Sequence, residues 1–193
     1  MTAPADDVAV LQTATSLVVL ALSTYTSLQA LPAGGGASGL AVVRDHLDDA
    51  VTTLRQARAD LGAATRQAGG RVQQQPDPVY APVVAQALPT VRSAGDVVGL
   101  ALTLEDVLAQ TLAADVGAVS TPALRRLCGS LAAGAAERKA RLLIVSSLLS
   151  TGSAQLVAAP PDLAAMPAGT GTVGFPDARF PTDKAAPAQE GAL

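Results

Sequence analysis

The chain is poor in cysteine, histidine and aromatic residues. Its 193 residues contain one cysteine, one histidine, no tryptophan, two tyrosines and two phenylalanines. The single cysteine, Cys128, excludes a disulfide within the chain and a cluster of thiolate metal ligands. Because large rings are scarce, the core must come from Ala, Leu and Val, which pack well as helix on helix. These absences favour a close-packed helical domain.

Positive charge is also limited. The net charge is −3 and the isoelectric point is about 5, so the composition gives no reason to expect a nucleic-acid partner. Residues 1–7 lack a basic region and include Asp6 and Asp7, which argues against a signal peptide. The apolar run 17–31 is interrupted by Ser, Thr and Gln, so we expect no membrane insertion. A soluble, cytoplasmic protein is expected, and the Arg- and Ala-rich composition is typical of GC-rich bacteria.

The hydrophobic pattern predicts four long helices, near residues 6–31, 38–68, 93–119 and 121–149. The second has the clearest pattern, because apolar residues recur at steps of three and four and form a heptad seam. The members of this seam are Leu40, Val43, Leu47, Ala50, Leu54, Ala57, Leu61 and Ala64. The connection 71–90 is the longest and surrounds a possible short helix at 79–88. Two helical hairpins joined by one long crossover define a ferritin-like, up-down four-helix bundle, an all-α fold.

The composition changes after residue 150, which predicts a helical domain at 1–150 and a Pro/Gly-rich C-terminal arm at 151–193. Both phenylalanines of the chain, Phe175 and Phe180, lie in this arm, and each precedes a proline. Proline biases the residue before it toward an extended backbone. We therefore predict that 172–183 docks as an extended segment, onto its own bundle or onto a partner protein. The remainder, 184–193, is expected to stay loose.

Glutamate is scarce, and its placement suggests a site. Of the three glutamates, Glu190 lies in the arm, whereas Glu105 and Glu137 lie near the middle of the third and fourth predicted helices. A carboxylate in an apolar helix pair is costly unless it meets a cation, a metal or a proton. We expect the two carboxylates to approach each other inside the bundle.

Arginine offers these two carboxylates partners that need no metal. Glu137 has Arg141 four residues further on, which is the favourable order for a helical ion pair. Glu105 could meet Arg138 or Arg141 across the helix pair. Such pairs are the structural alternative to a metal site.

Several motifs in order along the chain resemble the ferritin-like domain proteins common in actinobacteria. They are Leu102-Thr-Leu-Glu-Asp-Val107, Thr121-Pro-Ala-Leu124 leading into Gly134-Ala-Ala-Glu137, and Phe175-Pro-Asp-Ala-Arg-Phe-Pro181, preceded by Asp7-Val-Ala-Val-Leu11. The resemblance implies a four-helix ferritin-like bundle, whose di-metal sites take glutamates from two helices and Glu-x-x-His pairs from the other two.

The matching ligand positions are only partly kept, which implies a degraded di-iron site. The first-helix glutamate position falls on Val18, and Ala140 stands where a histidine would follow Glu137. The second-helix pair falls on His46 and Asp49, or on Leu47 and Ala50 if the alignment shifts by one residue. The candidate ligands for iron or manganese are therefore Glu105, Glu137, His46 and Asp49.

His46 and Cys128 also have simpler interpretations. His46, the only histidine, is flanked by aspartates and could be a half-buried side chain paired with a carboxylate. Cys128 lies inside a predicted helix, where a free cysteine usually behaves as a small buried apolar residue.

Three functions follow from these patterns. The first is a non-catalytic ferritin-like structural or interaction module, with no cofactor and no enzymatic activity. The second is a di-metal carboxylate protein or oxidoreductase that uses iron or manganese with a reduced ligand set. The third is an accessory subunit that docks on a protein partner, or on a second copy, through Phe175 and Phe180.

Overall fold

A computed structural model of the chain describes residues 4–31, 37–150, 184–187 and 191. These residues form five α-helices and one 3-10 turn, without a β-strand, so the predicted all-α class is confirmed. The four long helices begin and end within two residues of the expected bounds, and the predicted short helix is also present. The elements are α1 Pro4–Gln29, α2 Ala37–Gln67, α3 Tyr80–Ala87, the turn η1 Leu88–Thr90, α4 Ala94–Ala118 and α5 Pro122–Ser150.

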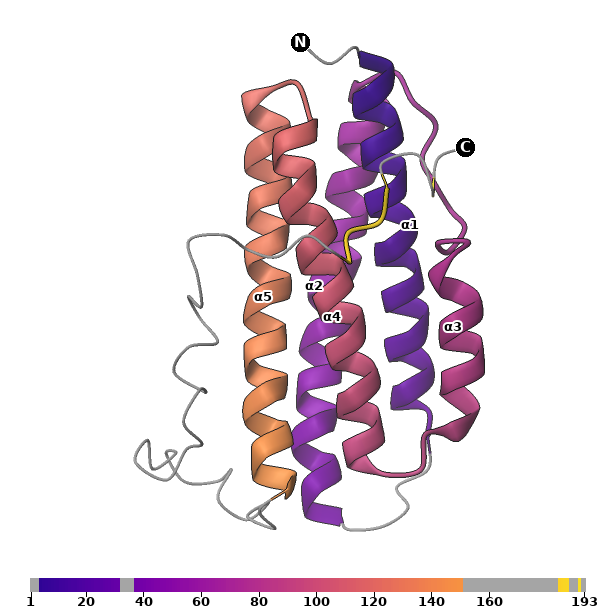
Figure 1. The fold of residues 1–193 in the computed structure, drawn as a ribbon, viewed down its shortest axis with the longest axis vertical. Coiled ribbons are helices and arrows are strands. Elements are labelled where there is room, and N and C mark those ends of the chain that lie inside the picture. The colour runs from indigo at the N-terminus through magenta and orange to yellow at the C-terminus, as the bar shows by residue number, and fades with distance from the viewer. Residues whose placement is uncertain (1–3, 32–36, 151–183, 188–190, 192–193) are drawn as a thin grey trace.

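The four long helices lie side by side along the long axis of the molecule (Figure 1). α1 packs mainly against α2, and α4 packs mainly against α5, so the bundle consists of two antiparallel hairpins. α2 ends at one end of the bundle and α4 begins at the other. The connection between them, residues 68–93, therefore runs the length of the bundle and places α3 against α1.

Local signals in the sequence explain where the helices begin and end. Ser93 caps α4 in a reciprocal arrangement with Asp96, in which each side chain accepts from the backbone N–H of the other residue. α5 begins at Pro122, and Thr121 Oγ1 accepts a hydrogen bond from the Leu124 backbone N–H at 3.2 Å. After α2, Gly69 has a positive φ of 84°, a conformation that glycine adopts without steric cost.

The core follows the seam predicted for α2. The seam residues from Val43 to Leu61 are all buried. α4 is the central helix, because every residue from Leu104 to Leu112 is buried. Such all-round burial requires a neighbour on each side of the helix. α5, α1 and α2 supply three of these neighbours.

Asp77 attaches the long connection to α1. This fully buried carboxylate accepts hydrogen bonds from Ser16 Oγ at 3.1 Å and from the backbone N–H groups of Val79 and Tyr80. Its own backbone N–H donates to the Ser16 carbonyl at 3.1 Å. One aspartate thus starts α3 and holds that helix against the bundle.

The prediction that 184–193 stays loose is wrong for the residues of this segment that the structure describes. Ala186 is buried, and its backbone N–H donates to Thr111 Oγ1 at 2.9 Å. Gly191 donates to Thr13 Oγ1 at 3.2 Å and accepts from Gln73 Nε2 at 2.7 Å. Side-chain hydroxyl and amide groups of the bundle thus hold the backbone of the arm. Sequence periodicity does not reveal contacts of this kind.

The docking segment itself lies outside the described residues. These exclude 151–183, and with them Phe175, Phe180 and most of the arm. α5 ends at Ser150, where the sequence predicted the end of the helical domain.

Two helices, Asp6–Gln29 and Ala94–Ala118, are long and apolar enough to cross a membrane by length and composition alone. The run 17–31, whose polar residues argue against membrane insertion, overlaps only part of the first of these helices. Most of each helix is buried inside the bundle, and the core helix of a soluble protein passes the same test.

Candidate functional site

Glu105 lies on α4 at the centre of the bundle and is completely buried. Its position follows from the burial of every α4 residue from Leu104 to Leu112. A buried carboxylate of this kind must find strong hydrogen-bond donors. The structure supplies two, one from α5 and one from α1.

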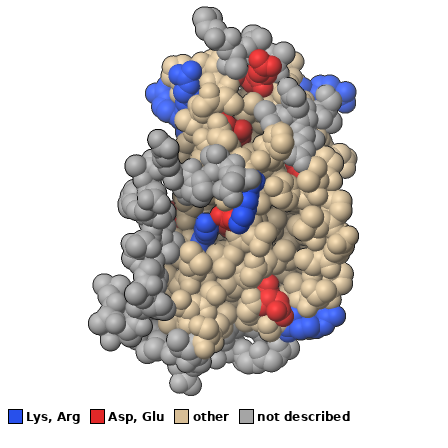
Figure 2. All heavy atoms as spheres, viewed as in Figure 1, with Lys and Arg blue, Asp and Glu red and all other residues tan. Residues whose placement is uncertain are grey.

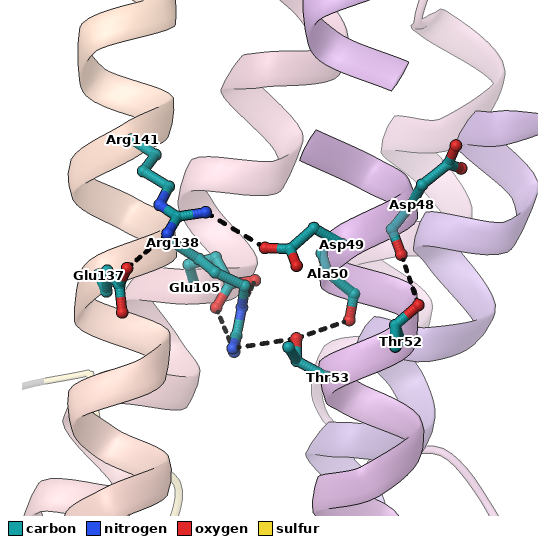
Figure 3. Close-up of polar contacts among 9 residues, drawn as sticks. All are labelled: Asp48, Asp49, Ala50, Thr52, Thr53, Glu105, Glu137, Arg138 and Arg141. Atoms are coloured by element: carbon teal, nitrogen blue, oxygen red, sulfur yellow. Dashed lines mark hydrogen bonds and ion pairs between the residues drawn. The ribbon is translucent and has the colours of Figure 1, made fainter. Parts of the chain in front are cut away.

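Arg138 on α5 forms a two-point ion pair with Glu105 (Figure 3). Arg138 Nε donates to Glu105 Oε1 and Arg138 Nη2 donates to Glu105 Oε2, both at 2.9 Å. Burial alone would lower the pKa of Arg138, but the charge and hydrogen bonds of Glu105 raise it, so the guanidinium stays charged. A third donor, Arg138 Nη1, reaches Thr53 Oγ1 on α2 at 3.4 Å.

Tyr25 on α1 completes the contacts of Glu105. Its hydroxyl donates to Glu105 Oε1 at 2.6 Å, and its ring is fully buried. Burial raises the pKa of Tyr25 well above its usual value, and the charge of Glu105 raises it further. The phenol therefore remains a donor. Residues from all four long helices meet at this centre, namely Tyr25, Thr53, Glu105 and Arg138.

The prediction that Glu137 enters the bundle beside Glu105 is wrong. The Glu137 side chain is 64% exposed and accepts from Arg141 Nη2 at 2.6 Å. Arg141 also pairs with Asp49 of α2 at 3.3 Å (Figure 3). The expected i, i+4 pair does form, but on the surface, because residue 137 precedes the inward-facing Arg138 by one position and is rotated by about 100° around the helix.

His46 lies on α2 and is buried, but its ring atom Nε2 has no hydrogen-bond partner within the described residues. Burial, together with the nearby charge of Arg138, lowers the pKa of His46 to about 4. The ring is therefore neutral at physiological pH. His46 is therefore buried and neutral, not the half-buried side chain paired with a carboxylate that one interpretation of the sequence suggested.

The four candidate metal ligands lie around two arginines. Arg138 binds Glu105, and Arg141 joins Glu137 to Asp49. In the part of the chain that the structure describes, no group of three or more His, Cys, Asp or Glu side chains is arranged to hold a metal ion. A cation at Glu105 would have to displace hydrogen bonds from Arg138 and Tyr25.

A second polar cluster lies on the outer side of α4, where Asp106 meets two lysines. Lys139 Nζ donates to Asp106 Oδ1 and Lys184 Nζ donates to Asp106 Oδ2, both at 2.6 Å. Burial would raise the pKa of Asp106, but hydrogen bonds from the two lysines and Gln110 lower it to about 2. In Figure 2 this side of the molecule is otherwise mostly uncharged. The cluster anchors the C-terminal arm on α4.

Another buried carboxylate, Asp115, lies near the end of α4. Its Oδ2 atom has no hydrogen-bond partner in the described residues, and burial raises its pKa to about 7. Burial, together with the charge of Asp115, raises the pKa of Cys128 to about 12. The thiol is fully buried and protonated, so the expectation that Cys128 is a buried apolar side chain is confirmed.

No family profile, no curated protein and no solved structure matches the chain. The ferritin-like resemblance therefore depends on the sequence motifs and on the helix arrangement in Figure 1.

Proposed function

We propose that the protein is a non-catalytic, ferritin-like module in which an arginine takes the place of the bundle's metal. The observation that supports this proposal is the saturation of Glu105. Both of its oxygens accept hydrogen bonds from Arg138, and one also accepts from Tyr25. A permanently charged side chain thus supplies the compensation that a buried carboxylate needs.

The helix arrangement also supports a ferritin-like origin. Two antiparallel hairpins are joined by a connection that runs the length of the bundle, as ferritin-like connectivity requires. α3 is an additional helix within that connection. We propose a soluble, cytoplasmic bundle, in which the two most apolar helices are used as core.

Metal analysis tests this proposal. Protein purified from its native host should contain no stoichiometric iron, manganese or zinc, and added iron(II) or manganese(II) should bind weakly. As a second arm, Arg138→Met would remove both Arg138 hydrogen bonds and leave Glu105 with the bond from Tyr25. Stoichiometric metal in the native protein, lost on Glu105→Gln, would instead establish the alternative, a di-metal carboxylate protein with a reduced ligand set.

We further propose that the module serves as an accessory subunit through its arm. Residues 184–187 and 191 are held by the chain's own bundle, so the preceding Phe175 and Phe180 are tethered to it. A Phe175→Ser, Phe180→Ser variant keeps these anchors and removes both rings. It should lose association with a protein partner or a second copy while its thermal stability stays unchanged. A drop in stability without lost association would indicate docking within the chain.

A further inference from the structure

A hollow beside α2 is lined by three arginines and is separate from the Glu105 centre. It has a volume of about 370 Å³ and is open to solvent. Arg55, Arg58 and Arg66 of α2 surround it, and its apolar lining includes Leu22 of α1 and Val72 of the long connection. Ligand pockets for small molecules commonly begin near this size.

The spacing of the arginines directs all three toward the same hollow. Residues three apart on a helix are neighbours, and eleven residues make about three full turns, so Arg55, Arg58 and Arg66 share a face. Gly62 lies between them and lacks a side chain that would fill the space. A Cβ at Gly62 would lie 3.8 Å from Arg66 Nη1, so this guanidinium lies close to the glycine.

Within the described part of the chain, no acidic side chain forms an ion pair with these three arginines. Arg58 donates to the neutral amide of Gln74 at 2.5 Å. Arg55 and Arg66 have neither a hydrogen bond nor an ion pair within the described residues. The neighbouring acid Asp60 accepts from Gln56 instead. Three arginines without an ion pair among the described residues therefore concentrate positive potential at one hollow, in a protein of net charge −3.

We propose that this hollow binds a small organic phosphate. Guanidinium groups match phosphate oxygens with paired, charge-assisted hydrogen bonds. Leu22 and Val72 can contact an apolar portion of the same ligand. The phosphate monoester is the recognised group, whether it belongs to a free metabolite or to a lipid headgroup.

Titration of the full-length, ¹⁵N-labelled chain with hexyl phosphate and with inorganic phosphate tests the site. We expect saturable shifts of amide signals within residues 55–66, with tighter binding of hexyl phosphate. Arg55→Gln and Arg66→Gln should each weaken binding by about fivefold or more. Arg44→Gln is the matched control, because Arg44 is an exposed arginine earlier on α2 that does not line the hollow.

A second variant tests the shape of the hollow without changing its charge. In Gly62→Ala, the new methyl group would lie 3.2 Å from Val72 Cγ1 and would narrow the hollow. Alanine is the better helix former, so the helix should persist. Hexyl phosphate should bind this variant more weakly. Undiminished binding would overturn the location of the site.

Vesicles distinguish the two sources of phosphate. The chain is mixed with phosphatidylcholine vesicles that either contain or lack phosphatidic acid. If the ligand is a lipid headgroup, only the vesicles with phosphatidic acid should retain the chain, and this retention should depend on Arg55 and Arg66. Binding of soluble hexyl phosphate alone would identify a free metabolite. Equal weakening by Arg44→Gln and Arg55→Gln, or the absence of saturable binding to any probe, would overturn the proposal.

Discussion

Two neighbouring carboxylates on α4 have different surroundings although their partners are also neighbours. Glu105 pairs with Arg138 and Asp106 pairs with Lys139, so a step of one residue on both helices separates the two pairs. The Glu105 and Arg138 side chains are 0% and 12% exposed, whereas those of Asp106 and Lys139 are 11% and 29% exposed. One step of about 100° on each helix moves the pair from the centre of the bundle to its outer side.

The choice of cation follows this difference. The inner pair, Glu105 with Arg138, uses arginine, which is weakly hydrated and binds both carboxylate oxygens at once. The outer pair, Asp106 with Lys139, uses lysine, which is a strongly hydrated point charge. This pair leaves one Asp106 oxygen for Lys184 of the arm. The inner pair thus closes the bundle centre, and the outer pair recruits a distant segment.

Removing the cation of the buried Glu105–Arg138 pair should have the largest effect on stability, compared with removing the cation of an exposed pair. Arg138→Met leaves Glu105 buried with Tyr25 as its remaining side-chain donor, and it should lower the free energy of unfolding by about 3–5 kcal/mol. Arg141→Met, at the exposed Glu137 pair, should cost less than about 1 kcal/mol. Urea denaturation of both variants measures the difference.

A double variant separates the loss of a partner from the loss of packing. Glu105→Leu combined with Arg138→Met removes both charges and should recover much of the stability that Arg138→Met loses. If Arg138→Met and Arg141→Met were equally stable, the inner pair would not be the buried contact described above.

The tyrosine beside the inner pair should have the next largest effect. Tyr25→Phe removes a hydrogen bond to a charged group and should cost about 2 kcal/mol. Because the folded-state pKa of Tyr25 is raised, the stability that it contributes is present below about pH 10 and is lost as the pH rises further. Alkaline unfolding monitored by circular dichroism should therefore be less steep in Tyr25→Phe.

Two buried side chains, each with one polar atom that has no hydrogen-bond partner among the described residues, should respond oppositely to pH. The pKa of His46 falls from 6.5 to about 4, so its contribution to stability is present above pH 6.5 and is lost as the pH falls through about 4. The pKa of Asp115 rises from 3.8 to about 7, so its contribution is present below pH 3.8 and is lost as the pH rises toward 7.

Single variants should separate these compensating trends. Between about pH 4 and 6.5, His46→Gln should lose stability relative to the wild type as the pH rises, whereas Asp115→Asn should gain. Urea denaturation across this interval measures both slopes. Parallel curves for the two variants would contradict the assignment of neutral forms to both groups.

The smallest effect on stability is expected at the outer pair and the arm. Lys184→Met should cost less than about 1 kcal/mol, because the Lys184 side chain is 58% exposed. Gly191→Ala places a Cβ within 2.1 Å of Ser16 Oγ and should prevent Gly191 from docking.

Hydrogen exchange should detect release of the arm, even where the free energy of unfolding changes little. In Gly191→Ala, the backbone amides at positions 186 and 191 should exchange faster than in the wild type. Gly99→Ala is the control, since a Cβ at this exposed helix position meets no atom within 4 Å. Unchanged exchange in Gly191→Ala would show that the contacts of Gly191 do not hold the arm.

The helices were predictable because their apolar residues have a regular spacing, most clearly in α2. The orientation of α5 can also be predicted from its sequence. Its buried residues Cys128, Ala135 and Leu142 recur every seven positions. Position 138 lies three residues after Ala135 and four before Leu142, so Arg138, and not Glu137, faces inward.

Other contacts could not be predicted from the sequence. Tyr25 shares the inward face of α1 with Ala21 and Leu28, but its bond to a residue 80 positions away depends on how two hairpins pack. The arm is held through backbone groups by Gln73, Gln110 and Thr111. A segment that is held through its backbone needs no particular side chains at these positions. Its sequence therefore carries no pattern that would predict the contacts.

The docking of Gly191 has a consequence for the order of folding. Its partner Thr13 is 178 residues away, and contacts that close such long loops form late. Its other partner, Gln73, lies on the long connection, and Lys184 binds α4. During synthesis, all three acceptor segments leave the ribosome before this one does. The described residues of the arm can therefore dock only after these segments have assembled, and until then we expect them to stay accessible to proteases. Their protection from cleavage would mark the completion of folding.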